Sequence, residues 1–365
     1  GIATDEAQRL YARGRTLAER LGDPGLRGMI VMAFAAATFW SGDIAGGFVR
    51  AEEAAQLGDV ADDPEIKVAL WLGTPIAVIW RGPLPIGLDR IERLLAVSQG
   101  NLELGSVLMG YSPYARALQL RAAILARTGS LEQARIDADE AIGLSRRRGD
   151  QDTLSWALAL LPHLTWLSGE SDQLEAPAME AVRLSEETGN IAGMVLGLEG
   201  LALAHLIAGR PTEAITTCKR ALAQAREHRS GLFEEPSLLA HLARARLQVG
   251  DPNGALLSAD QAVTVARRQG SRVVECLALL TRAQVRRATG AYDAAGDLTT
   301  DLEAALILAT TTGALTYEPF IREERSRIRP DETELREALR LCTAVGATGH
   351  ARRLQAELDA SPFGP

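Results

Sequence analysis

The chain has 365 residues and a formal net charge of −8, from 39 basic and 47 acidic side chains. This length exceeds one ordinary hydrophobic core, so it predicts either two domains or one elongated array. The hydrophobic fraction of 47% is that of a folded protein, and the low aromatic fraction of 4%, in a chain rich in alanine and leucine, favours an all-helical one. An acidic chain without a basic stripe argues against nucleic-acid binding by this segment.

The cysteines and the hydropathy pattern restrict the cellular setting. Cys218, Cys276 and Cys342 are widely spaced and form no Cys-x-x-Cys pair, so no disulfide framework or zinc site can be recognised. This usage fits a reducing cytoplasm, where we expect the protein to reside. The N-terminus lacks a secretion signal, and no apolar run reaches about 18 residues, so we expect no membrane association.

Glycines that can end a helix recur about every 40 residues along most of the chain. They are Gly42, Gly82, Gly129, Gly169, Gly209, Gly250 and Gly290. The positions five and twelve residues after each glycine, and seven before it, are mostly small. Because five and twelve differ by two helical turns, both later positions lie on one face of a helix. Each period therefore predicts two helices that pack closely as a hairpin.

These three ladders of small residues resemble the tetratricopeptide repeat, whose unit has 34 residues where this one has about 40. The resemblance implies a right-handed α-solenoid of helical hairpins over residues 1–313, followed by a C-terminal helical cap over residues 314–365. It specifies architecture and says little about function, because the same scaffold serves many partners.

The hairpins are not all alike. Residues 4–21 are expected to form the second helix of a truncated first repeat, which indicates a fragment of a longer protein. The hairpin after Gly82 has seven extra residues, and residues 100–113 predict either a longer loop or a change in superhelical pitch. Pro75 and Pro162 lie within first helices, where we expect kinks.

The glycine period stops after Gly313. Asp331 is predicted to cap a helix that runs to about Val345, and a last helix is expected over residues 350–359. The strings EPFIREERSRI and ELREALRLCTAVGATGHARRLQAEL, within residues 317–358, resemble the C-terminal end of large bacterial regulators. In that family an adenylate/guanylate cyclase-like or other signalling domain is joined to a nucleotide-switch (STAND-type) ATPase and a tetratricopeptide-like array. The resemblance implies a role in signalling or transcription regulation and transfers no catalytic residue.

Motifs that carry chemistry are absent from the sequence. It contains no Gly-x-x-x-x-Gly-Lys-[Ser/Thr] loop, no His-Glu-x-x-His and no Gly-x-Ser-x-Gly. We therefore expect no catalytic residue, no cofactor and no metal site, and we predict that the protein is not an enzyme. Among the histidines only His163 is expected to face the concave surface. His205 and His241 lie at different helical angles, which argues against a shared role as ligands from one face.

First helices line the concave side of a tetratricopeptide superhelix, so the resemblance also implies which side chains point inward. The fifth hairpin contributes mainly apolar residues there, with Glu199 the exception. The candidate binding residues are Met32, Phe39, Trp40, Trp80, Arg116, Arg127, Trp156, His163, Trp166, Arg244, Gln248 and Arg287. The tryptophans either fill a tightly wound array or form the walls of an open groove. A groove would suit an amphipathic peptide or a small apolar molecule with an acidic group, since arginine pairs with carboxylates.

Two functions are compatible with these features. The first is a non-catalytic recognition and regulatory module that binds a protein or peptide, including the ATPase or effector domain of the same polypeptide. The alternative is a sensor whose small-molecule ligand, held in the superhelix, controls an upstream ATPase.

Overall fold

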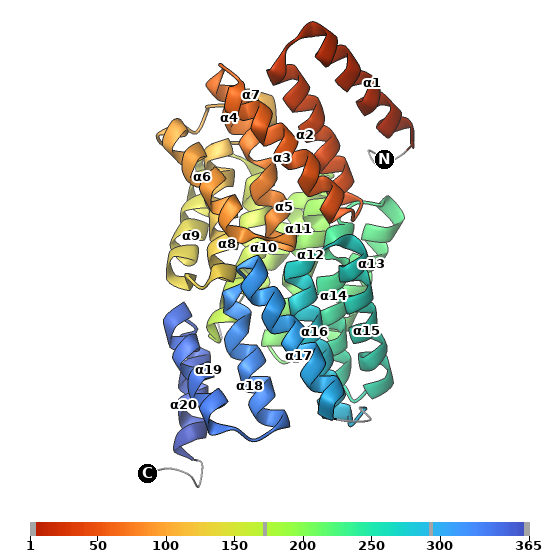
Figure 1. The fold of residues 1–365 in the computed structure, drawn as a ribbon, viewed down its shortest axis with the longest axis vertical. Coiled ribbons are helices and arrows are strands. Elements are labelled where there is room, and N and C mark those ends of the chain that lie inside the picture. The colour runs from red at the N-terminus through yellow and green to blue at the C-terminus, as the bar shows by residue number, and fades with distance from the viewer. Residues whose placement is uncertain (1–4, 171–173, 292–294, 361–365) are drawn as a thin grey trace.

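The computed structural model describes residues 5–170, 174–291 and 295–360. Helices form all of the regular secondary structure in these residues, and they pair into antiparallel hairpins that wind into a right-handed solenoid (Figure 1). This confirms the predicted fold class. No helix in the described ranges is both long and apolar enough to cross a membrane.

The helix boundaries follow the predicted period closely. In chain order the helices, with η marking 3-10 helices, are α1 (Asp5–Leu21), α2 (Pro24–Trp40), α3 (Ile44–Val60), α4 (Pro64–Trp71), α5 (Gly73–Arg81), α6 (Leu84–Ser98), α7 (Ser106–Met109), α8 (Pro113–Thr128), α9 (Leu131–Arg148), α10 (Gln151–Ser168), α11 (Glu175–Thr188), α12 (Ile191–Ile207), α13 (Pro211–His228), η1 (Leu232–Glu234), α14 (Glu235–Gln248), α15 (Pro252–Gln269), α16 (Arg272–Thr289), α17 (Ala295–Thr312), η2 (Leu315–Tyr317), α18 (Glu318–Ile328), α19 (Glu332–Val345) and α20 (Thr348–Asp359).

The small residues of the repeat let the two helices of a hairpin approach each other. Ala202 of α12 and Ala214 and Ala221 of α13 are fully buried where these helices meet. In the hairpin of α2 and α3, a Cβ added to Gly47 would lie only 2.9 Å from the Cβ of Phe39. Larger side chains at these positions would force the helices apart, so the ladders determine the hairpin geometry.

Two sequence features change the first half of the array. The expected first helix is divided at Leu72 into α4 and α5, one turn before Pro75, which cannot donate a helical hydrogen bond. Pro162 instead lies inside the continuous helix α10. The extra residues after Gly82 form a loop that contains the short helix α7.

The array of hairpins continues past Gly313. After η2, helices α18 and α19 form another antiparallel pair, although the turn between them has Pro330 and Asp331 in place of a glycine. Asp331 caps α19 as predicted, because its carboxylate accepts a hydrogen bond from the backbone N–H of Thr333 at 2.9 Å. The glycine period ends here, where the turn lacks a glycine and α18 has only 11 residues.

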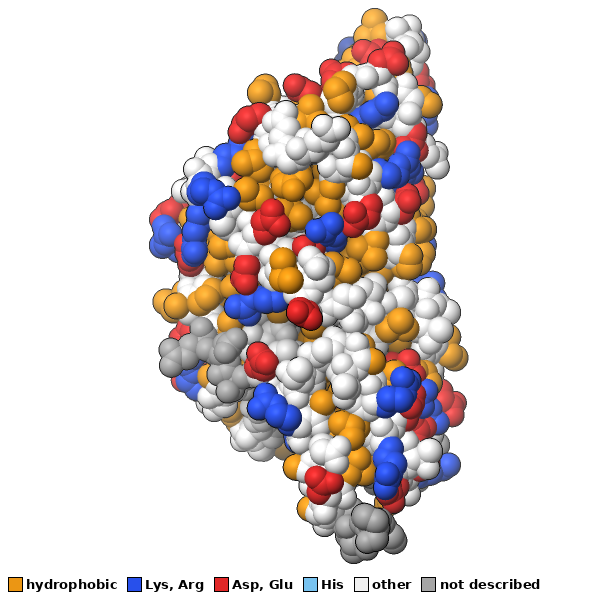
Figure 2. Space-filling model, turned by 90° about the vertical axis from the view of Figure 1, so that its left-hand side faces the viewer, with side chains coloured by type: hydrophobic (Ala, Val, Ile, Leu, Met, Phe, Trp, Pro, Cys, Tyr) orange, Lys and Arg blue, Asp and Glu red, His pale blue; other side chains and the backbone are white. Residues whose placement is uncertain are grey.

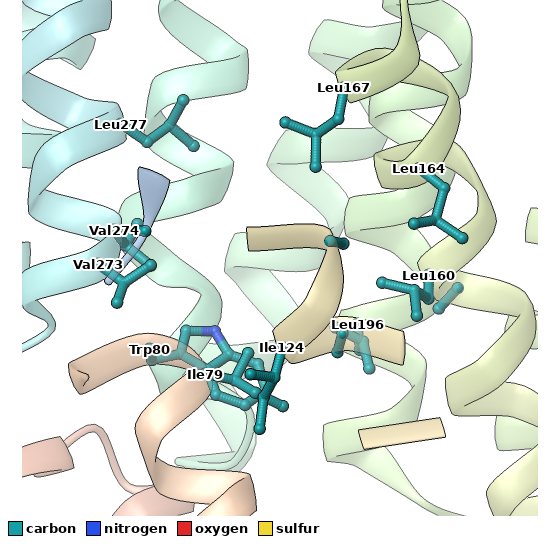
Figure 3. Close-up of a cluster of buried hydrophobic side chains, with 14 of the residues drawn as sticks. Ile79, Trp80, Ile124, Leu160, Leu164, Leu167, Leu196, Val273, Val274 and Leu277 are labelled. Atoms are coloured by element: carbon teal, nitrogen blue, oxygen red, sulfur yellow. The ribbon is translucent and has the colours of Figure 1, made fainter. Parts of the chain in front are cut away.

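Successive turns of the superhelix touch each other. The hydroxyl of Thr316 donates to the carbonyl of Ala126 at 2.6 Å, and His350 Nε2 lies 2.8 Å from the carbonyl oxygen of Trp166. The partners are 190 and 184 residues apart in the sequence. Figure 3 shows a cluster of buried hydrophobic side chains inside the superhelix, where residues of α5, α10 and α16 point toward one another. The core therefore lies along the axis as well as within the hairpins.

Substitution of Gly349 tests whether successive superhelical turns are in contact. A Cβ at this position would lie 2.0 Å from the carbonyl oxygen of Gly169, which is backbone and cannot rotate away. We expect Gly349→Ala to lower the free energy of unfolding in urea by about 1–3 kcal/mol, as other overpacked contacts do. Gly143→Ala is the control, since the added Cβ would meet only the flexible end of Arg147 at 3.3 Å. Equal stability of the two variants would contradict the contact.

Candidate functional site

The inner wall has an open pocket near the N-terminal end, which we call the upper pocket. Its volume is about 330 Å³. It is lined by Met29, Met32, Ala33, Ala35, Ala36, Phe39, Trp40, Gly47, Ala51, Leu72, Gly73, Ile76, Ala77, Leu108, Met109, Tyr111, Arg116, Asp152, Trp156 and Asn190. Five of the predicted binding residues are among them, and most of the wall is apolar.

The inserted segment 99–112 closes one side of the upper pocket. Leu108 and Met109 of α7 and Tyr111 after it line the cavity. Val107 beside them is 90% exposed. Figure 2 shows hydrophobic side chains gathered on the upper half of the face that it draws, where Figure 1 places the N-terminal helices. The insertion can be recognised in the sequence, but its place against the groove cannot.

The polar end of the upper pocket is an ion pair already made within the protein. Arg116 donates to Asp152 at 2.6 Å, and its guanidinium lies 4.7 Å from the ring of Tyr111 and 4.9 Å from that of Trp156. The Arg116 side chain is 4% exposed, whereas that of Asp152 is 33% exposed. Asn190 also donates to Asp152. Arg116 is thus not a free cation for a ligand carboxylate, and Asp152 is the accessible charge.

Below the upper pocket, aromatic rings fill the superhelix. Phe233 of η1 lies 4.7 Å from Phe39 and 4.8 Å from Trp80, measured between ring centroids, and 6.3 Å from Trp156. The Trp80 indole donates to Glu234 at 2.9 Å. Burial, together with the nearby charge of Glu199, raises the pKa of Glu234 to about 7. Trp80 therefore packs the array, Trp156 both packs it and borders the upper pocket, and Trp40 lines the open pocket.

Three ionisable side chains meet at the centre of the array. His163 Nε2 lies 3.0 Å from Glu199 Oε2, and His241 Nε2 lies 2.7 Å from Glu199 Oε1. Burial alone would raise the pKa of Glu199, but the charges and hydrogen bonds of the two imidazoles outweigh it and hold this pKa well below its usual range. Burial would lower the pKa of His163, yet Glu199 raises it; the pKa of His241 is lowered, chiefly by burial. Imidazole nitrogen and carboxylate oxygen are also metal-ligand types.

From the repeat pattern, His163 and Glu199 are each placed on the inner wall, but no contact between them is predicted. The helical angle of His241 is compared with that of His205, which is not its partner in the structure. His205 lies elsewhere on α12, and the partner of His241 is Glu199, which bridges it to His163. The available signal is that α10, α12 and α14 are successive first helices, each with an ionisable residue in a largely apolar stretch. The angular position of a residue on its own helix does not predict that these three side chains, from three different helices, are in contact.

The remaining candidates lie at the lower end, where α18 covers the inner wall. Trp166 stacks on Phe320 of α18 at 5.5 Å, and the guanidinium of Arg244 lies over the same Trp166 ring at 4.8 Å. Arg287 forms an ion pair with Glu324 of α18. The other two candidates differ, since Arg127 donates to its own helix at Ala123 and Gln248 is exposed. The twelve predicted residues thus do not form one continuous groove.

Comparisons with known proteins find similarity among solved structures. No protein-family model matches the chain, and no curated protein matches it. Among solved structures, the Rap protein complexed with competence and sporulation factor is 11% identical, aligns over 90% of both chains and has a TM-score of 0.66. A STAND protein with a tetratricopeptide repeat sensor from Pyrococcus horikoshii (14% identical, TM-score 0.45) is aligned over 98% of this chain but only 54% of its own length. Yeast Tom70 (12% identical, TM-score 0.30) is aligned over 98% and 94%.

The first of these likenesses shows that the chain has a tetratricopeptide-like helical-repeat fold. At 11% identity it shows the fold alone.

The two roles of the tryptophans can be separated by truncation. Trp156 is 5% exposed within the aromatic core, so we expect Trp156→Ala to lower the free energy of unfolding by about 3–5 kcal/mol. Trp40→Ala, on the wall of the upper pocket, should cost clearly less because that ring already borders open space. Urea unfolding followed by far-UV circular dichroism measures both. Equal losses would mean that Trp40 is also a core residue.

Proposed function

We propose that the chain is a non-catalytic helical-repeat recognition and regulatory module that binds a peptide or protein segment in the upper pocket. The observation that carries this proposal is the pocket itself: a cavity of about 330 Å³ with an apolar wall and one accessible carboxylate, Asp152. Ligand pockets have this composition, with a mainly hydrophobic lining and few polar groups. The flexible side chains of Met29, Met32 and Met109 can adapt to an apolar side chain of the partner.

The charge of the pocket determines what the partner presents. Because Arg116 is buried against Asp152, a ligand carboxylate would meet the partly exposed Asp152 and be repelled. A segment that places an apolar side chain against the methionines and an N–H donor or cation near Asp152 fits better. The Rap protein, which has a similar fold, is described in complex with competence and sporulation factor, and this supports a binding role for the fold here.

The setting of this module is part of the same proposal. The resemblance of residues 317–358 to the end of large bacterial regulators supports a place beside a STAND-type ATPase or a cyclase-like domain in the cytoplasm. In that arrangement the segment bound by the upper pocket belongs to the ATPase or effector domain of the same polypeptide, and its release would couple the pocket to that domain.

The second candidate is a small-molecule sensor that uses the same pocket to control an upstream ATPase. A volume of about 330 Å³ lies within the range of small-molecule sites, which favours this function as well. Thermal shift separates the two candidates: a metabolite that raises the unfolding midpoint, with no peptide doing so, supports the sensor.

A bulky side chain placed in the upper pocket should block binding under either candidate function, because both use this pocket. Ala36 lines the upper pocket, and we expect Ala36→Trp to weaken the binding of an apolar, N-terminally cationic peptide selected from an array by at least about 10-fold. Fluorescence polarisation with the labelled peptide measures the dissociation constant. Ala223→Trp, on the exposed face of α13, is the matched control and should bind as the unmodified chain does. Binding that survives Ala36→Trp would place the ligand elsewhere.

A further inference from the structure

We propose that His163, Glu199 and His241 together bind one divalent transition-metal ion, zinc being the best match, at the centre of the superhelix. The site is separate from the upper pocket, and the proposal does not depend on the function assigned to that pocket.

The three side chains come from three successive first helices. His163 lies on α10, Glu199 on α12 and His241 on α14, and these helices pack side by side along the inner wall. The side chain of Glu199 is fully buried, that of His241 is 2% exposed and that of His163 is 20% exposed. Ligands carried on packed helices are held more firmly than ligands on loops, which favours a pre-formed site.

The ligand atoms are already close to the distances that a metal requires. All of them lie within 4.8 Å of one another, and the two imidazole Nε2 atoms lie 3.0 and 2.7 Å from the nearer carboxylate oxygens. Ligands about 2.0–2.1 Å from a tetrahedral zinc ion are roughly 3.3 Å apart. Each nitrogen–oxygen distance would have to widen by about 0.3–0.6 Å, and the widest pair of ligand atoms would have to close by up to about 1.5 Å, for the ion to be bound.

Within the part of the chain that the structure describes, the Glu199 carboxylate is buried and paired only with the two imidazoles. Glu199 has no exposed surface, and His163 Nε2 lies almost equally close to its two oxygens, 3.1 Å from Oε1 and 3.0 Å from Oε2. Among the described residues, only the two imidazoles lie within ion-pairing distance of this carboxylate. Burying a carboxylate costs several kcal/mol unless it is paired. A divalent ion would bind both imidazoles in their neutral form and neutralise the carboxylate at once.

A small cavity borders one of the three ligands, His163. It has a volume of about 30 Å³ and is lined also by Arg127, Trp156 and Glu234 and by apolar residues of α5, α8, α10 and α12, but not by Glu199 or His241. This is enough for a water molecule. Two histidines, one glutamate and one water form a set that zinc uses, and Fe²⁺ or Co²⁺ would accept the same donors. Bound there, the ion would join three consecutive hairpins and stabilise the array.

Metal binding to the full chain tests the site directly. After treatment with a chelator and dialysis, the chain should take up one Zn²⁺, measured by atomic emission. At a free Zn²⁺ concentration 100 times the dissociation constant, the unfolding midpoint should rise by about 3 °C. Co²⁺ in place of Zn²⁺ should give the visible absorption of a tetrahedral site. Uptake of less than one tenth of an ion per chain would overturn the proposal and leave a buried ion pair between Glu199 and a protonated histidine.

Variants locate the bound ion. We expect Glu199→Gln and His163→Gln each to weaken Zn²⁺ binding at least 100-fold and to abolish the Co²⁺ absorption. His163 is the more exposed ligand, so its variant should keep the helical circular dichroism even if Glu199→Gln does not. His205→Gln is the control, because His205 is buried on the same helix as Glu199 but lies outside the cluster. Undiminished Zn²⁺ binding by the folded His163→Gln variant would place the ion elsewhere and refute the site.

Discussion

The rings of Phe39, Trp80 and Phe233 pack against one another at the centre of the superhelix, with centroids between 4.7 and 5.2 Å apart. Phe39 and Trp80 belong to the first hairpins and Phe233 to one much later in the chain, so this stack joins two superhelical turns. Because aromatic rings bury large apolar areas and prefer fixed offsets, the stack limits how far the solenoid can open. The inner wall is therefore divided into an open upper pocket, a filled centre and a lower end covered by α18.

This division explains why the apolar cavity found among the described residues of a long inner wall is compact and lies at one end. A regular array would present a repeated groove. Here the break between α4 and α5 and the insertion with α7 both alter the N-terminal hairpins, and side chains from both line the upper pocket. The irregular repeats thus form most of the upper pocket, which lies at the N-terminal end of the array.

The burial of several ionisable side chains also depends on how tightly the superhelix closes. Glu199, Glu234 and His241 lie where the superhelix closes, and each would be solvated in a wider array. Burial holds the pKa of Glu234 near 7, while the imidazoles hold that of Glu199 low. The ionised form of Glu234 is therefore disfavoured in the fold, whereas the ionised form of Glu199 is stabilised there by its two imidazole partners.

The sequence by itself determined most of the helices, the cap at Asp331 and the hairpin pairing. These depend on residues within one period: the small positions around Gly209, the broken helix before Pro75 and the cap at Asp331 all act locally. Only the tertiary structure decided that Trp80 is core, that Arg116 is already paired and that His241 meets Glu199, 42 residues away. These contacts depend on rotations that add up from hairpin to hairpin. Each hairpin rotates slightly against the next, and the sum of these rotations, set by packing along the whole array, determines which inward side chains meet across the axis.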